Sequence, residues 1–346
     1  MKKVLVGMSG GVDSTVACLL LQQQGYEVVG VSFRFVEDFD DSDAKAVADK
    51  LNIEHHTIDY RSEFKSIIID KFLDDYSNGL TPNPCVHCNI NCKFKFLFDN
   101  MTKFNCDYIA TGHYAKIEDN KLKKSIDKNK DQTYFLYGIP KEMISKIKFP
   151  LDGIPKTKVR EIAKENGFFN YNKKDSFDVC FITESFKEYM KKNINSNPGD
   201  IVLIDSNEII GKHEGLNNYT IGQRRGLNIG GYDDRMFVVG KDTNKNILYV
   251  SIGDDSNYLI STSCVLSNIN LLVDEKFDKC MAKFRYRSDE VEVKVNWINE
   301  NEVVVSYDDL KRVTPGQACV FYDGDVCLGG GIITEVRKND KKLWYV

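Results

Sequence analysis

The chain has 346 residues, of which 42% are hydrophobic and 28% are charged, and its formal net charge is -4. This length predicts two or three domains with enough residues to bury a full core. The net negative charge excludes a general attraction to nucleic acid, so any such contact requires a local basic patch. Met1 leads directly into an apolar stretch and no apolar run exceeds strand length, so we expect a cytoplasmic protein without a signal peptide or a membrane partner.

A glycine-rich loop follows the first predicted strand, Lys3–Val6, and opens a predicted helix over Ser14–Gln24. Its glycines allow a sharp turn with inward backbone N–H groups, and the helix N-terminus adds partial positive charge, so the loop suits a phosphate or pyrophosphate. It lacks the lysine of the GxxxxGK[ST] loop. The pattern SGGxDS is instead typical of ATP-pyrophosphatases, which split ATP into AMP and pyrophosphate; the alternative is an ordinary strand-to-helix turn. The loop consists of Gly7, Met8, Ser9, Gly10, Gly11, Val12, Asp13 and Ser14.

The first part of the chain alternates predicted strands with predicted helices. This rhythm predicts an α/β domain with a doubly wound parallel sheet, whose ligands bind beyond the carboxyl ends of the strands. Phe33 and the turn Thr111–His113 fall at such ends. The predicted strands are Lys3–Val6, Glu27–Phe33, His55–Asp59 and Asp107–Thr111, and the predicted helices are Ser14–Gln24, Asp43–Leu51, Ser62–Tyr76, Asn89–Phe104 and Thr157–Asn166.

The character of the sequence changes at the turn-rich stretch Asn193–Gly199, which predicts a domain boundary. Beyond it, alternating apolar and polar residues replace helical patterns, so we expect an all-β part that forms a small barrel. Upstream, the basic and polar stretch Lys121–Lys130 predicts a connector. The alternating runs are Val291–Ile298, Glu302–Tyr307, Ala318–Tyr322 and Val326–Leu328.

Two cysteine-containing segments suggest sulfur chemistry. In Thr81–Asn89, prolines stiffen a loop and Cys88 comes just before a predicted helix, whose N-terminus would stabilise a nucleophilic thiolate. Cys180 lies where a polar stretch meets an apolar one, and the two cysteines beside the loop suggest a relay thiol and a persulfide carrier; alternatively, Cys180 is a buried strand residue. The other cysteines should be reduced, and those expected in the core are Cys18, Cys106, Cys264, Cys280, Cys319 and Cys327.

A bound metal is an alternative use of these thiols. Cys85 and Cys88 form a CxxC motif with His87 and Cys92 close by, and this spacing can hold zinc. Cys85, Cys88 and Cys180 could also hold three corners of an iron–sulfur cluster. A single CxxC without a second clear pair is a weak metal signal. We therefore assign no metal ligand and take a metal-free sulfur relay as the simpler hypothesis.

The chain resembles the tRNA-specific 2-thiouridylases, enzymes of the ATP-pyrophosphatase superfamily that thiolate uridine 34 of the tRNA anticodon. The resemblance covers essentially the whole chain and keeps the family's order of motifs. It implies an ATP-pyrophosphatase catalytic domain over 1–195, a small central domain over 196–262 and a tRNA-contacting C-terminal β-barrel over 263–346. The motifs that carry it are Gly7–Ser14, Thr81–Asn89, Ala110–Tyr114, Lys130–Leu136, Lys174–Ile182, Tyr219–Leu227, Arg285–Arg287 and Pro315–Ile333.

The resemblance also implies roles for individual residues. ATP would bind the loop Gly7–Ser14, with Phe33 and Gly112 near the nucleotide. Cys88 would be the nucleophile and Cys180 the persulfide carrier. The implied contacts with the target base are Asn83, Pro84 and Cys85, and those with the rest of the tRNA are His113, Lys130, Asp131, Gln132, Arg285, Tyr286 and Gln317.

The implied reaction follows from the chemistry of uridine. The C2 oxygen is a poor leaving group, so ATP with Mg²⁺ would adenylate it and release pyrophosphate. Sulfur from the Cys180 persulfide then attacks C2, Cys88 attacks the persulfide or the intermediate, and a Cys88–Cys180 disulfide closes the turnover. The target base must leave the anticodon stack to reach the pocket.

The partners implied are tRNA, by family those for Lys, Glu and Gln, and a persulfide donor, a cysteine desulfurase or a relay protein; no DNA is expected. Two positions depart from the family: Cys85 replaces the usual Asp, and Thr133 the usual Ser. Two alternative functions would each account for one of these motifs. An amidotransferase-type synthetase would share the glycine-rich loop without needing paired cysteines, and a tRNA-binding module would share Arg285–Arg287 without needing the loop.

Overall fold

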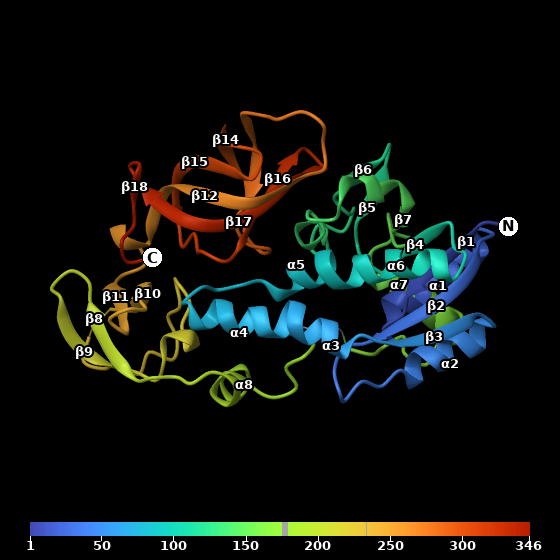
Figure 1. The fold of residues 1–346 in the computed structure, drawn as a ribbon, viewed down its shortest axis with the longest axis horizontal. Helices are drawn as coiled ribbons and strands as arrows, with labels where there is room; N and C mark the ends of the chain where they lie inside the picture. Colours follow the sequence, from blue (N-terminus) through green and yellow to red (C-terminus); the bar gives the residue numbers. More distant parts are fainter. Residues whose placement is uncertain (175–178, 233) are drawn as a thin grey trace.

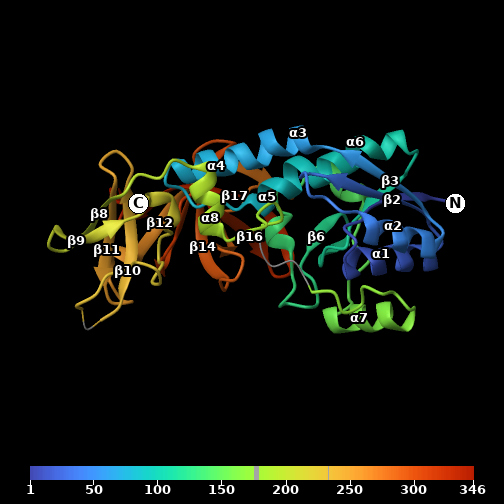
Figure 2. The same ribbon diagram turned by 90° about the horizontal axis from the view of Figure 1, so that it is seen from below.

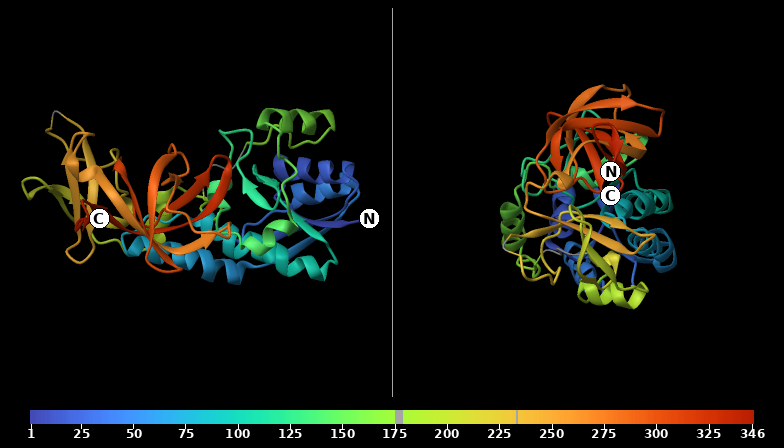
Figure 3. Two further views of the ribbon diagram at one scale, coloured as in Figure 1. Left: turned by 90° about the horizontal axis from the view of Figure 1, so that it is seen from above. Right: turned by 90° about the vertical axis from the view of Figure 1, so that its left-hand side faces the viewer.

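The computed structural model describes residues 1–174, 179–232 and 234–346. Figure 1 shows a helix-covered sheet, a small β domain at the opposite end, and a β-barrel above the middle of the molecule. The N-terminus lies at the outer end of the sheet domain, whereas the C-terminus lies near the small domain (Figure 3). Across the described ranges, no helix is both long enough and apolar enough to cross a membrane.

The N-terminal sheet contains β1 (Lys3–Gly7), β2 (Glu27–Arg34), β3 (Glu54–Asp59), β4 (Tyr108–Ala110) and β7 (Ile147–Lys148). Its order is β3-β2-β1-β4-β7 and every pair is parallel. Val4, Leu5 and Val6 of the central strand are fully buried and their side chains alternate between the faces, so Val4 and Val6 belong to one core cluster and Leu5 to another. The predicted doubly wound sheet is therefore confirmed.

Helices cover both faces of this sheet (Figure 2). The helices α1 (Val12–Gln23), α2 (Ser42–Leu51) and α7 (Lys156–Glu165) share one core cluster with Val4 and Val6, through residues such as Val16, Val47 and Val159. On the other face, Phe94 and Leu97 share a cluster with Leu5. The helices α1, α2 and α7 each begin within two residues of the predicted position, because the spacing of their apolar residues already defines the face that each helix buries.

Two helical rods lie side by side across that second face. The first joins α3 (Arg61–Phe64) to α4 (Asp70–Ser77) through the π-helical turn Lys65–Ile69, and the second joins α5 (Pro84–Cys88) to α6 (Lys95–Lys103) through the π-helical turn Asn89–Phe94. The rings of Tyr60 and Phe96 stack between them, with centroids 3.9 Å apart.

The second rod begins five residues before its predicted start at Asn89. The Asn83 side chain accepts a hydrogen bond from the Val86 N–H, and Pro84 takes the first helical position, where its missing N–H costs nothing. The sequence analysis also missed α8 (Phe186–Asn193), which begins with a reciprocal capping pair between Ser185 and Glu188.

The small central domain contains β8 (Gly199–Leu203), β9 (Glu208–His213), β10 (Met236–Asp242) and β11 (Ile247–Ile252). These strands have the order β10-β11-β8-β9. Its core includes Ile201, Val238 and Leu248, none of which is exposed. One short 3₁₀ turn, Leu216–Asn218, lies between β9 and β10, and another, Asn257–Leu259, follows β11.

The C-terminal barrel contains β12 (Ile260–Leu271), β13 (Lys279–Lys283), β14 (Val291–Trp297), β15 (Glu302–Lys311), β16 (Ala318–Asp323) and β17 (Val326–Lys338). β12 pairs with both β15 and β17, so the six strands close into a ring. Where β12 crosses β17, a side chain at Gly329 would begin 2.1 Å from the Asn270 carbonyl oxygen, so glycine is required. A short strand, β18 (Lys341–Lys342), adds to β17. The predicted barrel is confirmed.

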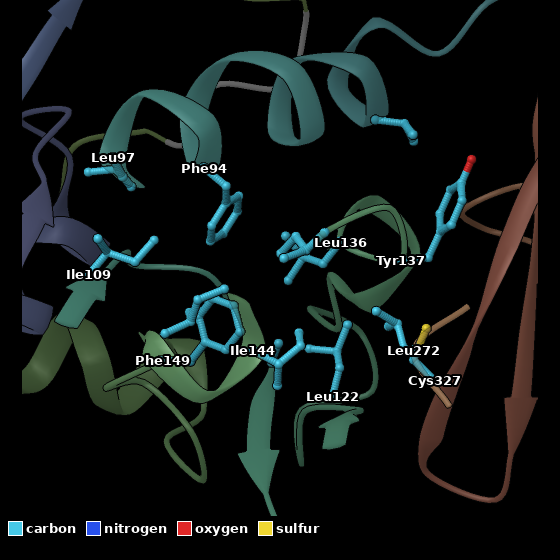
Figure 4. Packing of buried hydrophobic residues seen from close by; sticks show 14 of the residues in the cluster. Phe94, Leu97, Ile109, Leu122, Leu136, Tyr137, Ile144, Phe149, Leu272 and Cys327 are labelled. Atoms are coloured by element: carbon cyan, nitrogen blue, oxygen red, sulfur yellow. The ribbon is translucent and has the colours of Figure 1, made fainter. Parts of the chain in front are cut away.

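The barrel and the sheet domain share a hydrophobic core. The stretch predicted as a connector begins with β6 (Lys121–Lys123), which pairs with β5 (Lys116–Glu118) and reaches β17 through Lys123 and Val326. The 3₁₀ turns Thr133–Phe135 and Lys141–Lys146 follow it. Figure 4 shows the resulting cluster, in which Leu136 and Tyr137 lie between Phe94 on the helical rod and Leu272 and Cys327 of the barrel.

Lys241 lies where the central domain meets the other two. Its Nζ donates a hydrogen bond of 2.9 Å to the Gly79 carbonyl oxygen behind α4, and its backbone N–H donates one of 2.8 Å to the Tyr345 carbonyl oxygen. Burial lowers the pKa of its ammonium from 10.5 to about 7. The folded protein therefore favours the neutral amine near pH 7 and above, whereas the unfolded chain stays protonated until about pH 10.

This shift predicts that stability rises with pH between about 7 and 10, because the unfolded state binds more protons in that range. In Lys241→Met, we expect the increase in unfolding free energy from pH 7 to pH 9.5 to be smaller by about 2 kcal/mol than in the unaltered protein. Urea unfolding at each pH measures it. Lys245→Met, at an exposed lysine of the same domain, is the control and should keep the full increase; an unaltered slope in Lys241→Met would contradict the prediction.

Candidate active site

The glycine-rich loop follows β1 and is fixed by close backbone packing. Gly10 has φ +71°, and a side chain there would begin 2.7 Å from Cβ of Asp43, so only glycine fits. On the other side, a side chain at Gly112 would begin 2.8 Å from the backbone of Asp13 and Ser14. The turn after β4 therefore lies directly against the N-terminus of α1, as expected for two carboxyl ends of adjacent parallel strands.

Hydroxyl groups hold the loop in shape. The Ser9 N–H donates to Ser14 Oγ at 3.3 Å, and Ser14 Oγ donates to the Gly11 carbonyl oxygen at 3.1 Å. From the far side, the Asn170 amide donates to the Gly10 carbonyl oxygen at 3.0 Å and to Thr15 Oγ1 at 2.8 Å. The preformed loop directs the N-terminus of a twelve-residue helix toward the sheet edge, where an anion would be stabilised.

A lysine that the sequence analysis missed supplies positive charge to this loop. Lys156, 8% exposed at the first position of α7, places Nζ 2.6 and 2.7 Å from the two carboxylate oxygens of Asp13. The Tyr114 hydroxyl donates to the same carboxylate at 2.7 Å. A lysine in the first turn of a helix is unfavourable, because the helix dipole places partial positive charge there. This unfavourable position could have indicated from the sequence that Lys156 has a specific partner.

The structure corrects the predicted environment of Cys88. Cys88 does not precede a helix: it is the fifth residue of α5, inside a rod that runs from Pro84 to Lys103, and it is 5% exposed. Burial raises the pKa of its thiol to about 12. The first helical turn instead contains Cys85, whose side chain is exposed. The helix N-terminus therefore does not activate Cys88.

Lys93 is the cation that acts on the cysteines. The π-helical turn places it five residues after Cys88 in the same rod. Its ammonium lowers the pKa of the thiols of Cys85, Cys88, Cys92 and Cys180, whereas burial of the sulfur atoms raises all four, including those of Cys85 and Cys180, which are exposed as whole residues. Burial disfavours its own charge, yet these thiols raise the pKa of Lys93 above the ordinary value. Sequence analysis missed this residue, because a lysine at a helical spacing looks like part of a solvated face.

Cys180 belongs to the same group of thiols. It is exposed and lies in a turn that begins after Val179. Asp175 and Ser176 of the predicted motif lie outside the described residues. The neighbouring Phe181 is buried in a cluster with Cys88, Cys92 and Phe72. The alternative prediction of a buried strand residue is therefore wrong for Cys180. Among the cysteines expected in the core, Cys280 is half-buried and the other five are buried.

The described residues contain no group of three or more His, Cys, Asp or Glu side chains arranged to hold a metal ion. Lys93 places a positive charge near Cys85, Cys88 and Cys180, and this charge opposes a cation bound among them. The metal-free sulfur relay stays a prediction.

His113 connects the glycine-rich loop to the thiols. It follows Gly112, its Nδ1 lies 2.7 Å from Thr111 Oγ1, and its ring packs against Phe94 of the helical rod. Burial, and to a lesser extent Lys93, lowers the pKa of His113 to about 3. It is therefore neutral near pH 7. Phe33, at the end of β2, lies in an aromatic cluster with Tyr60 and Phe96.

The barrel holds the loop that leads to the cysteines. The Gln317 amide donates to the Thr81 carbonyl oxygen at 2.7 Å, and the Thr81 N–H donates to the Pro315 carbonyl oxygen at 3.2 Å. A side chain at Gly316 would begin 3.0 Å from the Thr81 backbone. Asn83 and Pro84 follow directly, so the predicted base contacts are positioned by the barrel, and Gln317 has this structural role.

The other predicted tRNA contacts lie near the junction of sheet domain and barrel. Asp131 is 7% exposed and accepts hydrogen bonds from the Ser125 N–H and the Thr133 hydroxyl, whereas Gln132 accepts one from the Tyr114 N–H. Lys130 is half-buried beside them. The ring of Tyr286 packs against that of Phe135, with centroids 4.4 Å apart.

Arg285 joins the barrel to the central domain. Its Nη2 donates to the carbonyl oxygens of Ile221 and Arg312 at 3.1 and 2.8 Å, and to Thr314 Oγ1. The side chain is half-buried and burial lowers its pKa. Its neighbour Arg287 is exposed. A tRNA contact by Arg285 stays a prediction, to which the structure adds a role in holding domains together.

Comparisons with known proteins agree over the full length. Family models match residues 2–184 (tRNA methyl transferase HUP domain), 187–252 (tRNA methyl transferase PRC-barrel domain) and 261–333 (aminomethyltransferase β-barrel domain). The tRNA-specific 2-thiouridylase MnmA of Oceanobacillus iheyensis is 44% identical over 99% of this chain and 98% of its own length, and that of Bacillus subtilis is 42% identical over the same shares. The chain belongs to the tRNA-specific 2-thiouridylase family.

The resemblance inferred from the motifs is confirmed by these relatives. The matching relative from Mesoplasma florum is 44% identical over 97% of this chain and its own full length. The descriptions of two family models mention methyl transfer, whereas the full-length relatives are 2-thiouridylases by name. A solved 4-thiouridine synthetase–RNA complex shares 17% identity and a TM-score of 0.38 over 56% of this chain and 50% of its own, too low to carry an argument.

The Arg285 contacts of this 2-thiouridylase family member predict a stability effect. Arg285→Ala removes donors to three acceptors at the domain junction, so we expect the free energy of unfolding to fall by about 2 kcal/mol. Thermal and urea unfolding measure the loss. Arg287→Ala removes an exposed guanidinium two residues away and should leave the unfolding transition unchanged; an equal transition in the two variants would contradict the structural role.

Lys93 predicts a change in thiol reactivity. Alkylation requires the thiolate, so the rate at Cys88 should rise with pH toward its pKa of about 12. Lys93→Met removes the charge that lowers this pKa, and at pH 8 we expect the alkylation of Cys88 by iodoacetamide to slow about fivefold. Peptide mass spectrometry follows the label. Lys95→Met, at an exposed lysine of the same rod, should keep the original rate, and a Lys93→Met variant that does the same would refute the role.

Proposed function

We propose that this protein is a tRNA 2-thiouridylase, a sulfurtransferase that converts uridine 34 of the anticodon to 2-thiouridine with ATP cleaved to AMP and pyrophosphate. Family membership over the full chain supports the proposal. The observation that carries it is the turn Thr111–His113. Gly112 of this turn packs on the phosphate-type loop at Asp13 and Ser14, and His113 packs on the rod that holds Cys88 and Lys93. The glycine-rich loop and the rod that contains Cys88 are thus joined by one turn, which supports an activation site beside a thiol site.

The glycine-rich loop is the proposed ATP site. Backbone N–H groups at the N-terminus of α1 would hold the phosphates, with Phe33 and Gly112 near the nucleotide. Lys156 supplies the positive charge that a GxxxxGK[ST] loop would carry in its own sequence, and its present partner is Asp13. Mg²⁺ takes most of its ligands from phosphates and waters, and Asp13 is the carboxylate that the loop presents to it. Bound Mg²⁺ would neutralise charge that develops on the phosphates.

The proposed reaction begins at the C2 oxygen of the uridine. This oxygen attacks the α-phosphorus of ATP, pyrophosphate leaves, and C2 now carries AMP as a leaving group. The terminal sulfur of a Cys180 persulfide bonds to C2, and AMP departs. The Cys88 thiolate attacks Sγ of Cys180, which breaks the bond to the transferred sulfur and leaves a Cys88–Cys180 disulfide. Lys93 favours the thiolate that Cys88 must form.

The proposed partners follow from exposure and position. Cys180 is exposed, so a persulfide donor, a cysteine desulfurase or a relay protein, can reach it. The tRNA would lie across the junction of sheet domain and barrel, with Asn83, Pro84 and Cys85 at the target base, after that base has left the stack. By family, the tRNAs for Lys, Glu and Gln are the proposed substrates, and the cytoplasm is the proposed location.

The direct test incubates the protein with ATP, Mg²⁺, a persulfide donor and an unmodified tRNA transcript. We expect 2-thiouridine at position 34 in nucleoside mass spectra, one AMP for each sulfur transferred, and no product from a transcript with cytidine 34. A methylated base formed with a methyl donor, or pyrophosphate release without thiolation of any tRNA, would refute the proposal and favour methyl transfer or an amidotransferase-type ligase respectively.

Lys156 predicts a defect confined to activation. In Lys156→Met the proposed phosphate site loses its buried cation, so we expect pyrophosphate release to fall at least about 100-fold, because such cations stabilise charge in the transition state. Release of labelled pyrophosphate in the presence of tRNA measures it, and circular dichroism checks the fold. Lys158→Met, at an exposed lysine of the same helix, should release pyrophosphate at the original rate; normal release by a folded Lys156→Met protein would overturn the assignment.

A further inference from the structure

Cys85 and Cys88 lie on one turn of helix and differ in exposure. Cys85 is the second residue of α5 and is exposed, whereas Cys88 is the fifth and is 5% exposed. Residues three apart in a helix share a face, with Cα atoms about 5 Å apart. This separation is within the range that a disulfide spans. The pair therefore has the arrangement of a dithiol with an accessible and a protected sulfur.

The same thiols are coupled through a shared charge. Cys85 and Cys180 both act electrostatically on the Cys88 thiol, and Lys93 lowers the pKa of all three. Cys88 thus has a potential disulfide partner in its own helix and another in the turn that contains Cys180.

We propose that Cys85 is a resolving thiol, which takes over the disulfide of Cys88 and releases Cys180 for the next sulfur. This inference rests on the proposed function, in which each turnover leaves a Cys88–Cys180 disulfide. Cys88 is 5% exposed, so an external reductant can attack its disulfide with Cys180 only at the exposed Cys180, whereas exchange with Cys85 opens a second route that leaves Cys180 free for the persulfide donor. Cys85 is adjacent in the helix and exposed to solvent, so it can both attack Cys88 and later meet the reductant.

The step is a thiol–disulfide exchange. The Cys85 thiolate bonds to Sγ of Cys88, the Cys88–Cys180 bond breaks, and its electron pair leaves with Sγ of Cys180, which takes up the proton that Cys85 lost to solvent. No net oxidation occurs in this exchange. A thiol reductant, small or protein-borne, then attacks the exposed Cys85 sulfur: the Cys85–Cys88 disulfide is reduced to two thiols and the reductant becomes the disulfide.

The experiment maps disulfides after one turnover. Protein carrying a persulfide on Cys180 reacts with ATP and tRNA without reductant, free thiols are blocked with N-ethylmaleimide, and peptides are identified by mass spectrometry. We expect a Cys85–Cys88 linkage with Cys180 free in the unaltered protein, and a Cys88–Cys180 linkage in Cys85→Ser and Cys85→Asp. Only the Cys88–Cys180 linkage in the unaltered protein would overturn the proposal. Cys280→Ser, in the barrel, is the control and should give the unaltered pattern.

Kinetics give a second readout. With reductant present, the ratio of multiple-turnover to single-turnover rate should fall about tenfold in both Cys85 variants, because loss of exchange slows only later turnovers, whereas a weaker contact with the target base lowers both rates alike. Equal ratios in the variants and the unaltered protein would refute the resolving role.

Oxidation with diamide separates this inference from the proposed function. It needs neither ATP nor tRNA, so it tests the dithiol even if no 2-thiouridine is formed. We expect a Cys85–Cys88 disulfide that forms in the unaltered protein and in Cys280→Ser. Protein in which Cys85 stays reduced while Cys88 is oxidised would overturn the inference whatever the outcome of the thiolation assay.

Discussion

The contact between Gly112 and the start of α1 is the constraint on which the rest of the site depends. Any side chain at this position would begin 2.8 Å from the backbone of Asp13 and Ser14. Because that space is closed, the turn after β4 lies against the glycine-rich loop, and the next residue, His113, is delivered to the helical rod that contains the thiols. The absence of a side chain at Gly112 thus lets the glycine-rich loop and the rod that contains Cys88 meet through one turn.

The barrel also helps to position the site, because its hydrophobic core is continuous with that of the sheet domain. Tyr134 is 1% exposed and its hydroxyl donates to the Ala318 carbonyl oxygen of β16, while Leu136 packs beside Leu272 and Cys327. A shared core resists the hinge motion expected between domains that meet through small polar interfaces. The contact of Gln317 with Thr81 then fixes the loop that enters α5. A tRNA bound across the barrel would therefore meet cysteines whose approach loop is already ordered.

Sequence patterns predicted the parts of this protein that depend on local order. Strand and helix periodicity gave the parallel sheet and the barrel, because each periodicity reports a buried face. Sequence patterns did not predict the role of a residue where that role depends on neighbours far away in the sequence. Lys156 reaches Asp13 across 143 positions, and Lys93 acts on Cys180 across a turn that no periodicity reveals. The start of the rod at Pro84 was missed because a single side-chain cap at Asn83 extends a helix by one turn.

The raised pKa of Cys88 makes its thiol poorly reactive in the free protein. With a pKa of about 12, its thiol is almost wholly protonated near pH 7 and reacts slowly with oxidants or electrophiles. Lys93 lowers this pKa in part, and in the proposed reaction a persulfide on Cys180 would bring a sulfur electrophile close to the same cation. The reactivity of Cys88 would then depend on whether Cys180 carries a persulfide. A helix N-terminus at Cys88 would have lowered the pKa of its thiol, whereas burial keeps that pKa high and the shared cation Lys93 offsets burial only in part.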